Sequence, residues 1–295
     1  MSLLAAAAAL AALGAPALRV TLTPSRAPQG GVVQVTVASP SPPLASAVLV
    51  DGERRIPLER LDGGRRFAGL MGVDFESKQG ERPLVVEGVD AAGVPVTATA
   101  TLRVVPRKFG VSKLSVDPRF VEPPPEEKER IERDREAFRK AFASPLPARL
   151  WEGRFTSPAK APSQGNFGAK RVYNGQTRSR HAGLDLSAPT GTRVAAPAAG
   201  VVVLAGEFYF AGGSVVLDHG GGLMTMYFHL SRIDVKEGDR VAPGQLIGAV
   251  GATGRVTGPH LHWAARLGGA RVDPAALLTL PARPASPPAG RPPRE

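Results

Sequence analysis

The sequence predicts a mainly β chain with more than one domain. Three observations lead to this fold class: short runs of β-branched residues recur along the chain, turns rich in glycine and proline separate them, and one segment has the charge pattern of a helix. The 295 residues include 34 Gly and 29 Pro, a content typical of turn-dense β structure and too low for a disordered chain. This length predicts about two domains.

Residues 1–17 are interpreted as a secretory signal peptide. Residues 3–13 are all Ala or Leu, and residues 14–17 have the small side chains of a cleavage site. The apolar run is shorter than the roughly 20 residues that span a bilayer, so no stable membrane span is expected. Because no Lys or Arg precedes the run, an uncleaved anchor stays open as an alternative. We expect a periplasmic or secreted protein.

Residues 18–106 predict an immunoglobulin-like β-sandwich. Segments 32–37 and 96–102 are rich in Val and Thr and alternate, and turns such as 51–52 and 62–64 separate runs of this kind. No polar cluster in this part has the spacing of a site. We therefore interpret it as a structural or spacer domain.

Residues 107–149 predict a linker that contains a charged helix. Its acidic and basic residues stand four apart in the order that stabilises a helix, as in Glu129 with Arg133 and Glu136 with Lys140. The helix is expected to lie on a surface and to connect two domains. Its apolar residues form only a thin stripe: Ile131, Phe138 and Phe142.

Residues 150–280 return to short strands and glycine-rich turns, and the proline-rich residues 281–295 predict a disordered tail. The net charge of +11 is spread along the chain. Nucleic-acid binding would favour a concentrated basic stripe with aromatic platforms, so an anionic surface is the expected partner.

The absence of Cys excludes disulfides, thiolate metal ligands and thiol catalysis. A metal in this chain must be held by imidazole and carboxylate.

Two motifs place histidines on the polar faces of strands. In segment 181–186, a period of two puts His181 and Asp185 on one face, with Gly183 between them. In segment 260–263, His260 and His262 share a face, while Leu261 and Trp263 point to the core. His-x3-Asp and His-x-His occur together by chance in about one chain in a hundred of this composition. The pair therefore indicates a site.

A third segment, residues 225–230, contains His229. Strict alternation puts His229 and Tyr227 on the face opposite Met226, Phe228 and Leu230. The three histidine-bearing faces are expected to line one groove. By contrast, His219 is interpreted as a structural residue, because a lone His on a strand is usually one.

These motifs resemble, in order, those of the lysostaphin-type (LytM-like) zinc metalloendopeptidases of bacterial peptidoglycan. The resemblance covers residues 150–280 and includes segment 226–231 and the Gly-Pro-His-Leu-His-Trp run at 258–263. Asn166-Phe167-Gly168 and the segment 178–181 resemble the exported, multi-domain members. The resemblance implies an antiparallel β-sheet with a groove, a metal on its floor, and peptidoglycan stem peptides or cross-bridges as substrate.

The resemblance also implies the site residues. His181, Asp185 and His262 match the ligands of one zinc ion, and His229 and His260 match the two catalytic histidines that are not ligands. Three protein ligands leave a fourth position for water, whose pKa zinc lowers toward about 7. One imidazole can accept a proton and another can stabilise the oxyanion, and the sequence does not assign these two tasks.

The expected function is hydrolysis of peptidoglycan cross-links, and the resemblance favours a D,D bond. The alternative is a non-catalytic wall-binding protein that activates amidases, as in relatives that have lost metal ligands. An iron oxygenase triad also uses two His and one carboxylate, but typically with a His-x-Asp spacing. No oligomer is specified, and a monomer is expected. Four basic side chains near His181 are expected to attract wall carboxylates: Lys170, Arg171, Arg178 and Arg180. Tyr173 and Asn174 are further candidates for contact with the substrate.

Overall fold

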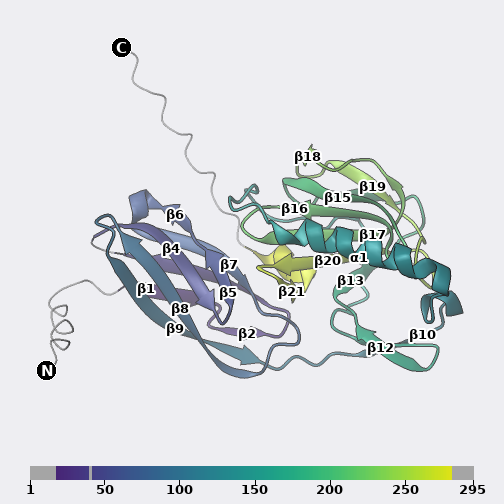
Figure 1. Ribbon diagram of the computed structural model, residues 1–295, viewed down its shortest axis with the longest axis horizontal. Helices are drawn as coiled ribbons and strands as arrows, with labels where there is room; N and C mark the ends of the chain where they lie inside the picture. The colour runs from purple at the N-terminus through teal and green to yellow at the C-terminus, as the bar shows by residue number, and fades with distance from the viewer. Residues whose placement is uncertain (1–17, 40–41, 281–295) are drawn as a thin grey trace, which may run out of the picture. The chain divides into compact units, whose positions relative to one another are not determined.

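The computed structural model describes residues 18–39 and 42–280. The predicted signal peptide and the predicted tail lie outside these residues. Strands predominate in the described part, so the prediction of a mainly β chain is confirmed (Figure 1). The boundaries predicted between sandwich, linker and C-terminal domain stay a prediction. The chain divides into two compact units, one formed by residues up to Ser25, Gln34–Gly69 and Arg82–Leu102, the other by Arg26–Val33, Leu70–Glu81 and the residues from Arg103 onward.

Two sheets run through the N-terminal hundred residues described, in agreement with the predicted sandwich. Their strand orders are β1-β3-β7-β6 and β2-β9-β8-β4-β5. Every second residue of β3 is buried, namely Val33, Val35 and Val37, as the alternation in the sequence requires. The bounds are β1 Arg19–Thr23, β2 Arg26–Pro28, β3 Val32–Ala38, β4 Leu44–Asp51, β5 Arg54–Pro57, β6 Glu59–Leu61, the 3-10 helix η1 Asp62–Gly64, β7 Arg66–Gly72, β8 Gly80–Asp90 and β9 Pro95–Val105.

Within the described residues, the C-terminal part is built on a nine-stranded sheet. Its main path is β13-β20-β17-β16-β15-β18, with β14, β19 and β21 paired beside it, and the pairs are antiparallel as predicted. Tyr227, Leu261 and Trp263 lie in its main core cluster. The bounds are β13 Gly183–Leu186, β14 Arg193–Ala195, β15 Gly200–Phe208, β16 Gly212–Asp218, β17 Leu223–Ile233, β18 Arg240–Val241, β19 Leu246–Val250, β20 Leu261–Leu267, β21 Ala270–Val272 and the 3-10 helix η4 Pro274–Thr279.

A smaller sheet joins a linker strand to the C-terminal part. β10 (Val111–Leu114) pairs in parallel with β11 (Lys170–Tyr173), which pairs with β12 (Gln176–Arg180). The Asn174 side chain continues the attachment. It donates from Nδ2 to the Val116 carbonyl at 2.9 Å and accepts from the Val116 amide at 3.0 Å. The sequence did not predict this parallel strand.

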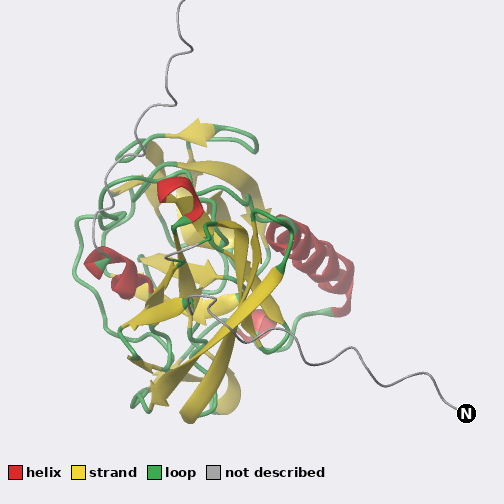
Figure 2. Ribbon diagram, turned by 90° about the vertical axis from the view of Figure 1, so that its left-hand side faces the viewer, coloured by secondary structure: helices red, strands yellow, loops and turns green. Residues whose placement is uncertain are grey.

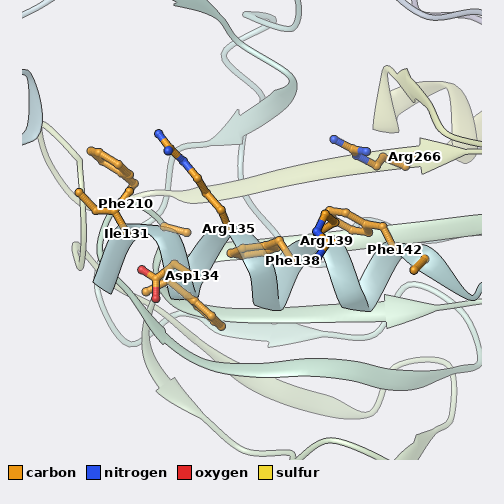
Figure 3. A pocket seen from close by; sticks show the side chains of 11 residues that line it. Ile131, Asp134, Arg135, Phe138, Arg139, Phe142, Phe210 and Arg266 are labelled. Atoms are coloured by element: carbon orange, nitrogen blue, oxygen red, sulfur yellow. The ribbon is translucent and has the colours of Figure 1, made fainter. Parts of the chain in front are cut away.

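The predicted charged helix is confirmed as α1, Lys128–Ala143, which follows the short 3-10 helices η2 (Pro118–Phe120) and η3 (Pro125–Glu127). α1 lies beside β15. Figure 2 shows α1 as the longest helix, along one side of the strands. The Phe138 ring contacts Phe208 and Phe228 of the sheet, with centroid distances of 4.8 and 5.6 Å. Figure 3 shows Phe138 and Phe142 on α1 among the residues that line a pocket beside the helix. Apolar packing therefore attaches α1 to the sheet, while the opposite side of the helix is charged. In the described residues, no helix combines the length and apolar character needed to cross a membrane.

β17 departs from strict alternation at His229. Tyr227 and Leu230 both lie in the core cluster of Trp263, whereas Phe228 packs in a second cluster with α1. The predictions that Leu230 shares a face with Phe228 and that Tyr227 lies on the polar face are therefore wrong. The register of β16 and β17 shifts at Gly213, and His229 has a φ of 66°. An irregularity of this kind turns the following side chains to the other face.

His219 belongs to a buried chain of hydrogen bonds inside the sheet, which confirms its structural interpretation. Its Nδ1–H donates to the Ala199 carbonyl at 2.7 Å, and its Nε2 accepts from the Thr225 hydroxyl at 2.8 Å. The Tyr227 hydroxyl lies 2.6 Å from that of Thr225. Burial lowers the pKa of His219 to about 4. Protonation would place a second donor where the network needs an acceptor.

Acidification should therefore destabilise the chain through His219. The unfolded imidazole has a pKa of about 6.5 and the folded one a pKa of about 4, so between these values only the unfolded state takes up the proton. The contribution of neutral His219 to the free energy of unfolding is complete above the pKa of the unfolded imidazole, and it falls by about 3 kcal/mol from pH 7 to pH 4. His219→Gln should lack this component. Tryptophan fluorescence during denaturant unfolding measures it, because Trp151 and Trp263 lie in the same core. Equal pH losses in both proteins would contradict the assignment.

Candidate metal centre

Strand pairing brings the three predicted ligands together. Asp185 on β13 is the register partner of His262 on β20, and His181 lies two residues before the start of β13. His181 Nε2 lies 2.8 Å from His262 Nδ1 and 3.1 Å from Asp185 Oδ1, and the last two atoms are 2.9 Å apart. Among the residues that the structure describes, these three side chains form a group with the ligand types and spacing of a metal site.

Groups outside this triangle fix how its members point. His181 Nδ1–H donates to the Asn166 carbonyl at 3.0 Å, which leaves a lone pair on Nε2 toward the triangle. Asp185 Oδ2 accepts from Asn166 Nδ2 at 2.8 Å and lies 3.6 Å from Arg171 Nη2. Its Oδ1 is thereby directed to the imidazoles. Such outer contacts orient metal ligands and raise their basicity.

The environment favours the protonation states that bind a metal. Burial lowers the pKa of His181 and brings the pKa of His262 to about 4. Burial alone would raise the pKa of Asp185, but its interactions with the neighbouring His181 and His262 side chains outweigh burial and hold the pKa below its usual range. Neutral imidazoles and an ionised carboxylate are the forms that coordinate metal ions.

The donor set fits a zinc ion. Two imidazole nitrogens and one carboxylate oxygen are among the ligand sets of catalytic zinc sites. Ligand atoms around a tetrahedral zinc at its usual bond lengths lie about 3.3 Å apart, close to the edges of the observed triangle. The assignment of these residues as zinc ligands stays a prediction.

The two remaining predicted site histidines lie beside the triangle. The ring centroid of His229 is 5.0 Å from that of His260 and 6.0 Å from that of His262. Each Nδ1–H donates to a backbone carbonyl at 2.9 Å, that of Thr253 for His229 and that of Gly258 for His260. Both Nε2 atoms keep a lone pair, and His260 Nε2 lies 3.6 Å from Asp185 Oδ1. Burial, followed by the two neighbouring imidazoles, lowers the pKa of His229 well below its ordinary value.

A cavity of about 90 Å³ adjoins His229 and His260. Ser112 and Leu114 of β10 line one part of it, so the linker strand contributes to the walls of the site. Arg255 also lines the cavity. The sequence did not predict a contribution from β10 or from Arg255.

The basic residues predicted around His181 have different positions. Arg171 contacts Asp185, and its Nη1 donates to the Tyr173 hydroxyl at 3.0 Å. Arg180 instead donates to the Gly168 carbonyl at 3.1 Å and lies over the Phe109 ring. Lys170 is exposed. Tyr173 is buried at the cavity, whereas Asn174 holds the linker backbone.

Two residues of the site escaped the sequence prediction as site residues. Asn166 was noted only as part of a motif, yet its side chain contacts both the carboxylate and the backbone of Asp185. Arg255 lies between the Gly254 turn and the His-x-His motif, and that position was the only signal in the sequence. Both side chains come from loops, where no periodicity indicates direction.

Gly183 provides the space that the His262 ring occupies. A Cβ at this position would lie 2.5 Å from His262 Nε2 and 2.8 Å from the Trp263 carbonyl oxygen. On the other side, the Phe228 ring stacks parallel to the imidazole, with centroids 5.4 Å apart. The ring is thus held between a strand backbone and an aromatic face. Only glycine fits here without moving a ligand.

The sequence and the fold are similar to those of known proteins. Residues 179–274 match the sequence model of peptidase family M23. A solved structure described as a putative peptidase M23 from Pseudomonas aeruginosa has a TM-score of 0.65 and 32% identity, and the match covers 85% of this chain and 94% of that one. The chain therefore belongs to peptidase family M23.

Curated relatives match over a shorter region. The peptidoglycan DD-endopeptidase ShyA of Vibrio cholerae is 44% identical over 111 residues, which cover 37% of this chain and 26% of the relative. The DD-carboxypeptidase/endopeptidase Mpg of Neisseria meningitidis is 45% identical over 97 residues, which cover 33% of this chain and 22% of the relative. The match spans about a quarter of the length of these relatives.

Gly183→Ala is expected to weaken zinc binding by roughly 10- to 100-fold, the range seen when support for a ligand is lost. The added methyl group would displace the His262 imidazole from the triangle. Titration calorimetry with zinc measures the change. Gly206→Ala on β15 is the matched control, because its Cβ would meet only ordinary contacts at 3.7 Å. Equal zinc affinity in the two variants would contradict the role of Gly183.

Proposed function

We propose that the chain is a zinc-dependent endopeptidase that hydrolyses the peptide cross-links of peptidoglycan, at a D,D bond. The observation that carries this proposal is the convergence of His181, Asp185 and His262 beside two imidazoles with free Nε2 atoms. Membership of peptidase family M23 supports a peptidase. The names of ShyA, a peptidoglycan DD-endopeptidase, and of Mpg, a DD-carboxypeptidase/endopeptidase, support the bond type.

One zinc ion would be held by His181 Nε2, Asp185 Oδ1 and His262 Nδ1. When bound, zinc acts as a Lewis acid and lowers the pKa of a coordinated water toward about 7. Asn166 and Arg171 would keep Asp185 oriented, because they engage its other oxygen. Gly183 and Phe228 would keep the His262 ring in its plane.

His229 and His260 would handle the protons of the reaction. Their Nδ1–H groups are bound to carbonyls, so each ring presents Nε2 and cannot easily rotate. An imidazole held in this way can accept a proton from the attacking water and later donate it to the leaving amine. Its partner, when protonated, can stabilise the negative oxygen of the tetrahedral intermediate.

The proposed substrate also sets the expected location. Peptidoglycan lies outside the cytoplasm, so we infer a periplasmic or secreted protein that acts on stem peptides. The net charge of +11 suits an anionic wall. We infer no role for nucleic acid, and a monomer is sufficient for the proposed chemistry.

The alternative function is activation of amidases by a wall-binding protein without catalysis of its own. Such a role would not require a complete set of ligands with supporting contacts. The described residues include all three proposed ligands and both further imidazoles, and each of these side chains except that of His262 has an orienting hydrogen bond from outside the triangle. The intact site therefore favours the enzyme.

Mass analysis of muropeptides distinguishes the two functions. Purified peptidoglycan treated with the zinc-loaded chain should lose cross-linked dimers and gain monomers whose sugar–peptide bond is intact. Products cut between sugar and peptide, or no products unless an amidase is added, would contradict the proposal.

Two histidine substitutions should separate zinc binding from turnover. His262→Ala should lose both zinc and hydrolysis, because it removes a ligand. His229→Ala should keep one zinc ion and lower kcat by about 10²- to 10⁴-fold, the contribution of one proton-transfer group. Metal analysis and the rate of muropeptide release measure the two effects.

His219→Gln provides the matched control, since it also removes an imidazole but lies outside the site. At pH 7 it should keep both zinc and hydrolysis. A His262→Ala variant that still digests peptidoglycan, or a His229→Ala variant without zinc, would show that the roles are assigned wrongly.

A further inference from the structure

Arg255 is a half-buried cation on the wall of the cavity that contains His229 and His260. Its guanidinium lies 4.7 Å from the ring centroids of both Tyr173 and Phe210. Its Nη1 donates to the Phe120 carbonyl over a long distance of 3.5 Å. In the described part of the chain, no ion pair joins Arg255 to a carboxylate. This arrangement differs from that of Arg171, which contacts Asp185.

A cation in such a place lacks compensation. Removing a guanidinium from water is unfavourable unless an anion or several acceptors replace the water. Burial lowers the pKa of Arg255, and the nearby charge of Arg171 lowers it further. Among the described residues, the one carboxylate that lines the cavity, Asp185, lies 3.6 Å from Arg171, which leaves Arg255 as the second cation of that lining without an anion to pair with. The cavity therefore has an excess of positive charge beside the candidate catalytic groups.

The geometry suits a carboxylate. A guanidinium is a planar fork that binds a carboxylate through two parallel hydrogen bonds. The two aromatic rings fix the plane of the fork, so little freedom is lost when an anion binds. A volume of about 90 Å³ equals that of about three water molecules, which is room for a carboxylate group and one water.

We propose that Arg255 binds a free carboxylate of the peptide substrate on the amine side of the scissile bond. This inference rests on the proposed function. In a D,D bond, the nitrogen is attached to a D-centre that carries its own carboxyl group, so the anion lies close to the reacting amide. Arg255 selects substrates in which this group is a free carboxylate over those in which it is a carboxamide.

Arg171 and Arg255, which both line the cavity, then have different tasks. Arg171 is engaged by Asp185 and by the Tyr173 hydroxyl, so it supports the ligand triangle. Arg255 has no such engagement and binds the substrate. Because it touches the substrate away from the bond that breaks, its loss should raise KM more than it lowers kcat.

The test uses two cross-linked muropeptides that differ only in this carboxyl group, one with the free acid and the other with the carboxamide. The zinc-loaded full chain should prefer the acid by roughly 10- to 100-fold in kcat/KM, the size of a charge-assisted hydrogen-bond pair. Arg255→Gln should bring this ratio close to 1. Arg255→Lys, which keeps the charge without the fork, should retain part of the ratio. An unchanged ratio in Arg255→Gln would overturn the proposal.

Arg266→Gln is the matched control. Arg266 is also half-buried, its guanidinium lies 4.5 Å from the Phe142 ring centroid, and burial lowers its pKa. It should keep the preference for the acid. A loss of preference in Arg266→Gln equal to that in Arg255→Gln would count against a specific contact. Thermal unfolding of each variant shows whether it is folded.

A binding measurement separates this inference from the proposed function. In a His229→Ala background, calorimetry gives the Kd of each muropeptide without turnover. If the acid binds more tightly than the carboxamide, and Arg255→Gln removes this difference, the carboxylate site is supported. Failure of the wild-type chain to cleave either peptide would refute only the proposed function. Equal Kd values for acid and carboxamide would overturn the inference, whatever the rate of cleavage.

Discussion

The close approach of His181 Nε2, Asp185 Oδ1 and His262 Nδ1 is the constraint on which the rest of the site depends. Three polar atoms buried within 3.1 Å of one another are unfavourable unless they share a proton or a cation. The register of β13 with β20 creates this contact, and Gly183 allows it because it has no side chain. Asn166 stabilises it from outside by engaging both His181 and Asp185. The surrounding sheet is the scaffold that keeps these groups in place.

Next to this triangle lie two further imidazoles and a small cavity. Backbone carbonyls hold His229 and His260 through Nδ1, which leaves the Nε2 lone pair of each ring available. The cavity beside them is narrow, and the linker strand β10 forms part of its wall. Arg255 gives that cavity a positive charge. The same small volume therefore combines proton-transfer groups with a group that suits an anion, as expected for a site that acts on a peptide bearing carboxylates.

Periodicity in the sequence predicted the parts that obey regular geometry. Alternation correctly placed Leu261 and Trp263 in the core, and therefore His262 on the site face of β20. The spacing of charges predicted α1, but its thin apolar stripe did not reveal that Phe138 packs on the sheet. The neighbours of His229 were placed wrongly because a register shift and a φ of 66° interrupt β17. Asn166 and Arg255 lie in loops, where tertiary contacts and not local pattern decide which way a side chain points.

The central claim is that one zinc ion binds at the triangle formed by His181, Asp185 and His262. Anomalous diffraction from a zinc-loaded crystal, recorded on both sides of the zinc absorption edge, tests it most directly. The account predicts one strong peak in this part of the chain, within about 2.0–2.3 Å of His181 Nε2, Asp185 Oδ1 and His262 Nδ1. A peak bound instead through His229 or His260, or a triangle that stays without zinc while the metal binds elsewhere, would contradict the account.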